Sequence, residues 1–138
     1  MKKLILLCFT AALVFTSCGN DDDSPTQDPL IGTWTYHKSF ENSVEDSLDD
    51  CLKRNSITVK SDATLTEVYY DFFDGNCELD YEDSAIWENL GNSIYKITYD
   101  VDEIYEDKIT FEGNTFFVEN TSSFGGETFT YKEVYIRN

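Results

Sequence analysis

From Leu30 to the C-terminus, hydrophobic and polar residues alternate over short runs that are separated by turn-forming residues. Alternation with a period of two, in runs rich in aromatic and β-branched residues, predicts β-strands. The Gly-Asn pairs at 91–92 and 113–114 are typical of the turns that join such strands. We therefore expect eight strands, over residues 32–40, 56–60, 64–73, 84–89, 93–100, 104–111, 115–120 and 127–137.

The segment 41–54 differs, because it is polar and acidic and has Val44, Leu48 and Leu52 spaced by four. That spacing fits one or two turns of amphipathic helix, or a long loop held by apolar contacts. The other connections are short, which makes an antiparallel up-and-down meander the simplest topology. Eight such strands can close into a barrel that is filled by side chains or holds one small ligand. We expect an all-β chain with one barrel domain over residues 30–138.

The first residues follow a different pattern. Two lysines precede an apolar stretch at 4–15, which is too short to span a bilayer and has the length of a signal-peptide hydrophobic region. Two small residues then lead to Cys18, and this arrangement resembles the lipobox of bacterial lipoproteins. The resemblance implies a lipoprotein signal peptide over residues 1–17 and lipid attachment at Cys18. An ordinary secretory signal with an incidental cysteine is the alternative.

Residues 18–29 are polar and acidic, so they cannot bury apolar area and are expected to form a flexible tether. The cluster Asp21, Asp22 and Asp23 resembles the surface-export signal of Bacteroidota lipoproteins. This resemblance implies a protein anchored by lipid in the outer membrane and exposed at the cell surface. A plain spacer that faces the periplasm is the alternative.

The charge balance excludes some partners. The 138 residues include 10 basic and 27 acidic ones, for a net charge of −17, and so offer no basic footprint for nucleic acid. The densest acidic groups, at 78–83 and 100–103, lack the glycine-centred spacing of an EF-hand loop and are expected to be solvated. We expect no metal site.

The sequence supplies no motif for catalysis. His37 is the single histidine, and neither a Ser-His-Asp pattern nor a glycine-rich phosphate loop occurs. We therefore expect a protein that is not an enzyme and that needs no cofactor.

Four cysteines are present. Cys8 lies in the signal segment and Cys18 is the lipid site, which leaves Cys51 and Cys77 in a compartment that permits disulfides. A redox or metal role would favour a Cys-x-x-Cys or histidine-rich neighbourhood, and neither is present. We expect a structural disulfide between Cys51 and Cys77.

The run Leu30-Ile31-Gly32-Thr33-Trp34 resembles the Gly-x-Trp opening of the first lipocalin strand. Followed by the two cysteines and the Gly-Asn hairpins, it resembles the lipocalin-like domains of Bacteroidota lipoproteins over residues 30–138. In lipocalins this tryptophan plugs one end of the barrel, and an arginine near the end of the last strand packs across it. The resemblance implies these roles for Trp34 and Arg137, and a guanidinium over an indole gains about 0.5–2 kcal/mol.

The resemblance also implies a ligand. If the barrel is hollow, one parity of each strand lines it, with an aromatic lining suited to a small apolar molecule. Charged ligands are disfavoured, because the acidic protein repels anions and no buried acid is evident to receive a cation. The alternative is a filled barrel that acts as a non-enzymatic interaction module and contacts another envelope protein or a glycan. The candidate lining residues are Tyr36, Phe40, Ile109, Phe111, Phe116, Val118, Phe129 and Tyr131.

Overall fold

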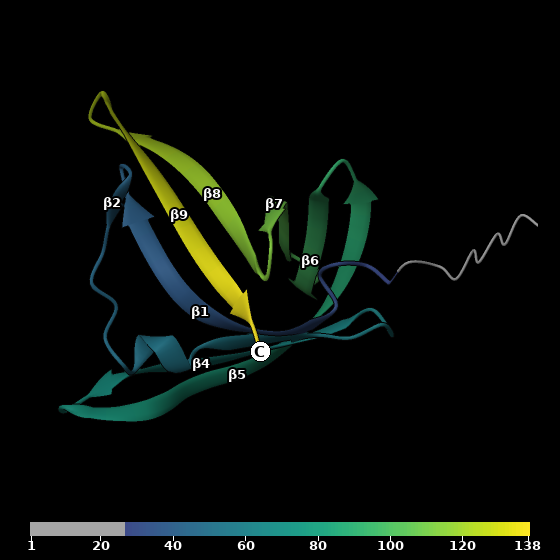
Figure 1. The fold of residues 1–138 in the computed structure, drawn as a ribbon, viewed down its shortest axis with the longest axis horizontal. Coiled ribbons are helices and arrows are strands. Elements are labelled where there is room, and N and C mark those ends of the chain that lie inside the picture. The colour runs from purple at the N-terminus through teal and green to yellow at the C-terminus, as the bar shows by residue number, and fades with distance from the viewer. Residues whose placement is uncertain (1–26) are drawn as a thin grey trace, which may run out of the picture.

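The computed structural model describes residues 27–138, and it confirms the expected all-β, lipocalin-like barrel. All strand pairs are antiparallel, and β1 pairs with β9 to close eight strands into a barrel (Figure 1). The remaining strand, β2, is a two-residue addition to the end of β1. The strands are β1 (Gly32–Glu41), β2 (Val44–Glu45), β3 (Ser56–Val59), β4 (Thr64–Phe73), β5 (Asn76–Gly91), β6 (Ile94–Asp100), β7 (Glu103–Glu112), β8 (Thr115–Phe124) and β9 (Glu127–Arg137).

The segment between β1 and β3 adopts the loop alternative rather than an amphipathic helix. Its helical part is one 3₁₀ turn, η1 (Leu52–Arg54). Val44 is 68% exposed, so the four-residue spacing does not mark a buried face. No helix within residues 27–138 is long and apolar enough to cross a membrane.

The β4–β5 hairpin is longer than the sequence predicted. β5 begins at Asn76 instead of residue 84, and its pairing with β4 runs from Phe73↔Asn76 to Thr64↔Ile86. The acidic run at 78–83 falls outside the predicted strands, but it forms part of a long ribbon, which extends past the body of the barrel in Figure 1.

A bulge in β1 changes which side chains face inward. The register with β9 shifts between Tyr36 and Lys38, which leaves His37 unpaired. An extra residue reverses the parity of the strand beyond it. Phe40 consequently lies on the outer face, where the Lys132 ammonium stands 5.9 Å from its ring centroid. The expectation that Phe40 lines the interior was therefore wrong.

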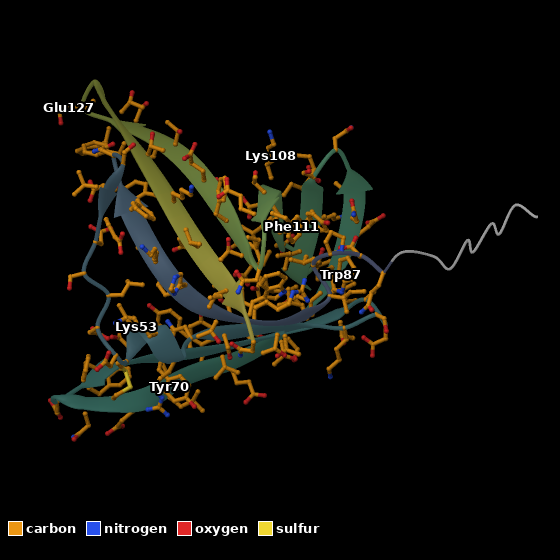
Figure 2. All side chains as sticks on the ribbon, viewed as in Figure 1. Lys53, Tyr70, Trp87, Lys108, Phe111 and Glu127 are labelled. Carbon is orange, nitrogen blue, oxygen red and sulfur yellow. A yellow bond between two sulfur atoms is a disulfide. The ribbon has the colours of Figure 1, made fainter. Side chains whose placement is uncertain are left out.

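One end of the barrel is filled. Trp34 is 1% exposed, its ring meets Phe116 edge-on at 4.8 Å, and its Nε1 donates to the Leu30 carbonyl at 2.7 Å. In Figure 2 the labelled Trp87 and Phe111 side chains lie toward this end, and Glu127 lies at the far end of β9. The buried cluster is completed by Val59, Leu65, Ala85, Tyr95 and Ile109.

The wall between β7 and β8 is only partly paired. The first part of β7 pairs with β6, and only residues 109–112 pair with β8. Beyond Val118, β8 therefore pairs with β9 alone, and Figure 1 shows β8 and β9 rising away from β6 and β7. The barrel is closed near its filled end and splayed at the other.

Candidate ligand-binding site

Three adjacent cavities occupy the splayed half of the barrel. One of about 160 Å³ lies against the packed core, and wider ones of about 280 and 530 Å³ lie beside it. Glu133 lines all three, so they adjoin at this residue. The interior is therefore filled at the Trp34 end and hollow above it.

The floor of this space is apolar. It is built by inward-facing residues of several strands. Alternate residues of a strand face the same side, so the strands that bury side chains in the core also direct side chains into this space. Beside the buried residues Leu30, Val59, Leu65, Ile109 and Phe116, the floor includes Ile57, Ile97 and Val118.

The walls above the floor carry tyrosines. Tyr69 and Tyr81 stand opposite each other on β4 and β5, and their rings stack with centroids 5.2 Å apart. The ring centroids of Tyr36 and Tyr135, on β1 and β9, lie 5.3 Å apart. Tyr99 and Tyr105 add a further pair, edge-on at 6.0 Å. The site is thus lined by paired tyrosine rings that carry hydroxyl groups.

Five carboxylates also line the interior, which the sequence analysis did not anticipate. They are Glu67 on β4, Asp83 on β5, Glu103 and Asp107 on β7, and Glu133 on β9. Asp83 and Glu103, from the two acidic groups, are exposed to solvent as expected, whereas Glu67 and Asp107 are half-buried. Strand alternation could have indicated their inward orientation, because each lies two residues from an inward-facing neighbour, as Glu67 does from Leu65.

Burial and neighbouring charges shift the pKa values of the tyrosines and of one glutamate in this wall. The Tyr99 hydroxyl donates to Glu67 at 2.7 Å, and burial together with this carboxylate raises the pKa of Tyr99. Burial, reinforced by Glu67, raises the pKa of Tyr81 to about 12. Water reaches Glu133 through the open cavity, yet burial by the surrounding wall raises the pKa of its carboxyl, and the Tyr135 hydroxyl opposes this rise. The charges of Glu67 and Asp107 raise it further.

Some of the predicted lining residues line the cavities, and others lie elsewhere in the barrel. Tyr36, Ile109, Phe116 and Val118 line the hollow space. Phe111 packs at the filled end, with its ring 6.2 Å from that of Trp34.

Two further predicted lining residues lie elsewhere. Phe129 and Tyr131 are on the inward parity of β9 but belong to none of the three cavities described. They lie nearer the far end of the strand, where Tyr131 is 44% exposed.

Arg137 covers the filled end from outside. Its Cζ lies 4.1 Å from the centroid of the Trp34 ring. The guanidinium also donates to the carbonyls of Ile31 and Pro29, at 2.8 and 2.6 Å. The last strand is thereby fastened to the segment that precedes the first.

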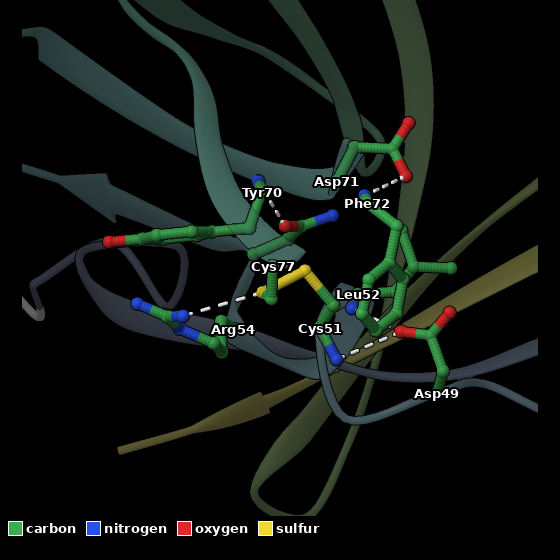
Figure 3. The surroundings of a disulfide bond; sticks show 9 residues. Asp49, Cys51, Leu52, Arg54, Tyr70, Asp71, Phe72 and Cys77 are labelled. Atoms are coloured by element: carbon green, nitrogen blue, oxygen red, sulfur yellow. Dashed lines mark hydrogen bonds between the residues drawn. A yellow bond between two sulfur atoms is a disulfide. The ribbon is translucent and has the colours of Figure 1, made fainter. Parts of the chain in front are cut away.

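The predicted disulfide between Cys51 and Cys77 is confirmed, with Cα atoms 5.5 Å apart. It joins the start of η1 to the start of β5 (Figure 3). Arg54 lies beside it, with Nη1 3.3 Å from the Cys77 sulfur and the guanidinium 3.9 Å from the Tyr70 ring centroid. The bridge ties the long loop to the β4–β5 ribbon.

Asn55 directly follows η1, and the sequence analysis did not identify it as a site residue. It is 5% exposed and lines the cavity of 280 Å³. Its Oδ1 accepts a hydrogen bond from the Tyr70 amide at 2.7 Å, and its Nδ2 has no hydrogen-bond partner among the described residues. Burial raises the pKa of Tyr69, and the nearby Asn55 amide opposes the rise without reaching hydrogen-bond geometry.

The lipid-attachment residue Cys18, the acidic cluster Asp21 to Asp23 and the signal segment 1–17 lie outside the described residues. Within residues 27–138, no three His, Cys, Asp or Glu side chains form a group suited to a metal ion.

Comparison with known families supports the topology. The family model of the lipocalin-like domain matches residues 30–118, from the filled end to the middle of β8. A comparison with curated proteins finds no match. The closing strand, β9, lies beyond the matched residues but completes the same barrel. By the family match and by this topology, the chain belongs to the lipocalin-like domain family.

Proposed function

We propose that this protein is a non-enzymatic binding protein that holds a small ligand in the hollow half of its barrel. The observation that carries the proposal is an apolar floor that adjoins an open, tyrosine-lined space. Ligand sites in proteins are typically concave and apolar, with a few polar groups that fix orientation. The floor would hold an apolar part of the ligand, and the wall above would orient the remainder.

The apolar floor supports affinity by area burial. Removing apolar surface from water contributes about 25 cal/mol per Å². The strands that form the floor are held by the packed Trp34 end, so the site is largely formed before the ligand arrives. A preformed site loses less free energy to ordering when it binds.

We further propose that the protein is anchored by lipid on Cys18 and displayed at the surface of the outer membrane. The signal-like segment and the acidic tether support this location. In Cys18→Ala, labelled palmitate should no longer enter the protein, and the protein should leave the membrane fraction. Continued labelling would overturn the anchor.

Surface display has a separate test. Replacing Asp21, Asp22 and Asp23 with Ala should protect the protein from protease added to intact cells. Unchanged digestion would overturn the role of this cluster in export.

The binding proposal is tested with N-phenyl-1-naphthylamine, a neutral apolar probe whose fluorescence rises in apolar surroundings. The full chain should bind this probe. Native mass spectrometry of the purified protein should detect a co-purifying ligand. Val118→Trp places a large ring in the apolar floor and should abolish probe binding. Phe117→Trp is the matched control, because Phe117 lies on the outer face of the same strand, 3.7 Å from the Lys132 ammonium.

Equal probe binding by both variants would place the probe outside the barrel and contradict the site. Absence of probe binding and of any co-purified ligand would overturn the binding proposal. The filled-barrel interaction module, contacting another envelope protein or a glycan, would then take its place.

A further inference from the structure

We propose that the ligand is a small organic cation, an amine that also carries a neutral oxygen acceptor. This inference rests on the proposed function and names the chemistry of its ligand. The ammonium would lie between Glu67 and Glu133, and the oxygen would accept a hydrogen bond from Asn55. All three residues line the same cavity.

The first argument is the charge of the wall. Five carboxylates face the hollow space, and none of the described residues that line its three cavities is basic. The ion pairs found among residues 27–138, Lys38–Glu45 and Lys53–Asp50, are both at the surface. The interior carboxylates therefore lack a cationic partner from the described chain.

This arrangement is unfavourable without a ligand cation. Like charges that face one space disfavour ionisation. Burial by the surrounding wall raises the pKa of Glu133, the Tyr135 hydroxyl opposes the rise, and Glu67 and Asp107 add to it. The only groups that donate to Glu67 and Glu133 are the hydroxyls of Tyr99 and Tyr135, among the described side chains. An ammonium would supply up to three donors and the missing positive charge.

The second argument is the aromatic wall around these acids. The rings of Tyr36, Tyr69, Tyr81 and Tyr135 line the same cavity as Glu67 and Glu133. The negative face of an aromatic ring attracts a cation within about 6 Å. Carboxylates combined with aromatic rings suit an organic ammonium better than a metal ion, and no three carboxylates converge as a metal-binding group within residues 27–138.

The third argument is independent of charge. The Asn55 side chain is almost fully buried, and the Tyr70 amide fixes which of its side-chain atoms is the oxygen. The remaining Nδ2 is a buried donor without a partner among the described residues. The Tyr69 hydroxyl lies nearby without a hydrogen bond to this donor. Such donors are rare because leaving one unpaired is costly, and an acceptor on the ligand would satisfy it.

The test compares four related probes by calorimetric titration of the full chain. Tyramine carries both the ammonium and a hydroxyl oxygen. Phenethylamine lacks the hydroxyl, 4-ethylphenol lacks the ammonium, and 3-(4-hydroxyphenyl)propanoate replaces the ammonium with a carboxylate. Tyramine should bind about tenfold more tightly than either neutral 4-ethylphenol or phenethylamine, and the anion should not bind.

The matched variants are Glu67→Gln, Glu133→Gln and the outer-face control Glu106→Gln. Each of the first two should weaken tyramine binding about tenfold and leave 4-ethylphenol unchanged, whereas Glu106→Gln should change neither. These comparisons use the same fold and nearly the same side-chain volumes, and the probe series on the unaltered chain does not depend on any variant.

Three results would overturn the proposal. If 4-ethylphenol binds as tightly as tyramine, the site does not select a cation. If phenethylamine binds as tightly as tyramine, Asn55 does not donate a hydrogen bond to the ligand oxygen. If none of the four probes binds while N-phenyl-1-naphthylamine does, the cation proposal is wrong and the proposed binding function is retained. If that neutral probe also fails to bind, the proposed binding function is wrong as well.

Discussion

The Arg137 guanidinium occupies the space in which a β-carbon on Gly32 would lie. Gly32 has φ of +147°, a conformation that residues with side chains rarely adopt. The same guanidinium stacks on Trp34, so the glycine and the tryptophan of the Gly-x-Trp opening serve one contact. The glycine leaves room for the cation, and the tryptophan receives it.

Gly32→Ala should therefore destabilise the barrel, by roughly 1–3 kcal/mol from backbone strain and displacement of the guanidinium. A double-mutant cycle with Arg137→Ala, measured by urea unfolding, separates the two effects. The penalty of Gly32→Ala should be smaller in the Arg137→Ala background, because the clash is gone. Equal penalties in both backgrounds would show that the two residues are uncoupled.

Trp34→Ala should lower the free energy of unfolding by roughly 3–5 kcal/mol, as for other buried aromatic side chains. The ring is 1% exposed, packs on Phe116 and donates to the Leu30 carbonyl. Phe124→Ala is the control, because Phe124 is 84% exposed and its loss should change stability little. A similar small change in both variants, measured by urea unfolding, would contradict the role of Trp34 as a plug.

The disulfide should contribute about 3.5 kcal/mol through the entropy of the unfolded chain, given its sequence separation of 26 residues. The double variant Cys51→Ala/Cys77→Ala should unfold at lower urea concentration than the oxidised protein. Adding reductant should destabilise the unaltered chain and leave the double variant unchanged. If the oxidised protein and the double variant have the same midpoint, the bridge does not stabilise the fold.

Glu133→Gln should stabilise the barrel at neutral pH. A carboxyl whose pKa is higher in the folded than in the unfolded state opposes folding once it is ionised, so its unfavourable effect appears as pH rises through these pKa values. Burial is the largest cause of the raised pKa, the Tyr135 hydroxyl opposes it, and the charges of Glu67 and Asp107 add to it.

The melting temperature of Glu133→Gln should therefore exceed that of the unaltered chain at pH 7. The difference should shrink below about pH 4.3, where a glutamate is protonated even in the unfolded chain. Glu106→Gln serves as the surface control. A gain of the same size at low and neutral pH would contradict an electrostatic origin.

The strands and the disulfide could be predicted from local sequence, because alternation and turn residues act over a few positions. The inward side of each strand was harder to assign. A bulge that leaves His37 unpaired turns Phe40 outward, and nothing in the residues around it marks that extra position. Register depends on pairing with β9, almost a hundred residues away.

The acidic lining was missed for a different reason. In a water-filled barrel an inward-facing carboxylate remains partly hydrated, so Glu67 and Asp107 do not interrupt strands whose inward faces are otherwise apolar. The acidic run before Ser84 falls outside the predicted strands, yet its alternation places Tyr81 and Asp83 on the cavity wall. Asn55 carries no local signal, since its burial arises only when η1 folds against β4.

The described chain begins at the filled end of the barrel, where Asp28 accepts hydrogen bonds from Asn89 and Tyr95 and the Pro29 carbonyl is held by Arg137. With a lipid on Cys18, residues 18–27 would span at most about 35 Å, because Asp28 and Pro29 are held by the barrel. A pull through that tether would act on the most tightly packed part of the protein. The point of attachment and the mouth of the cavity would lie at opposite ends of the barrel, so the anchor would leave the mouth unobstructed.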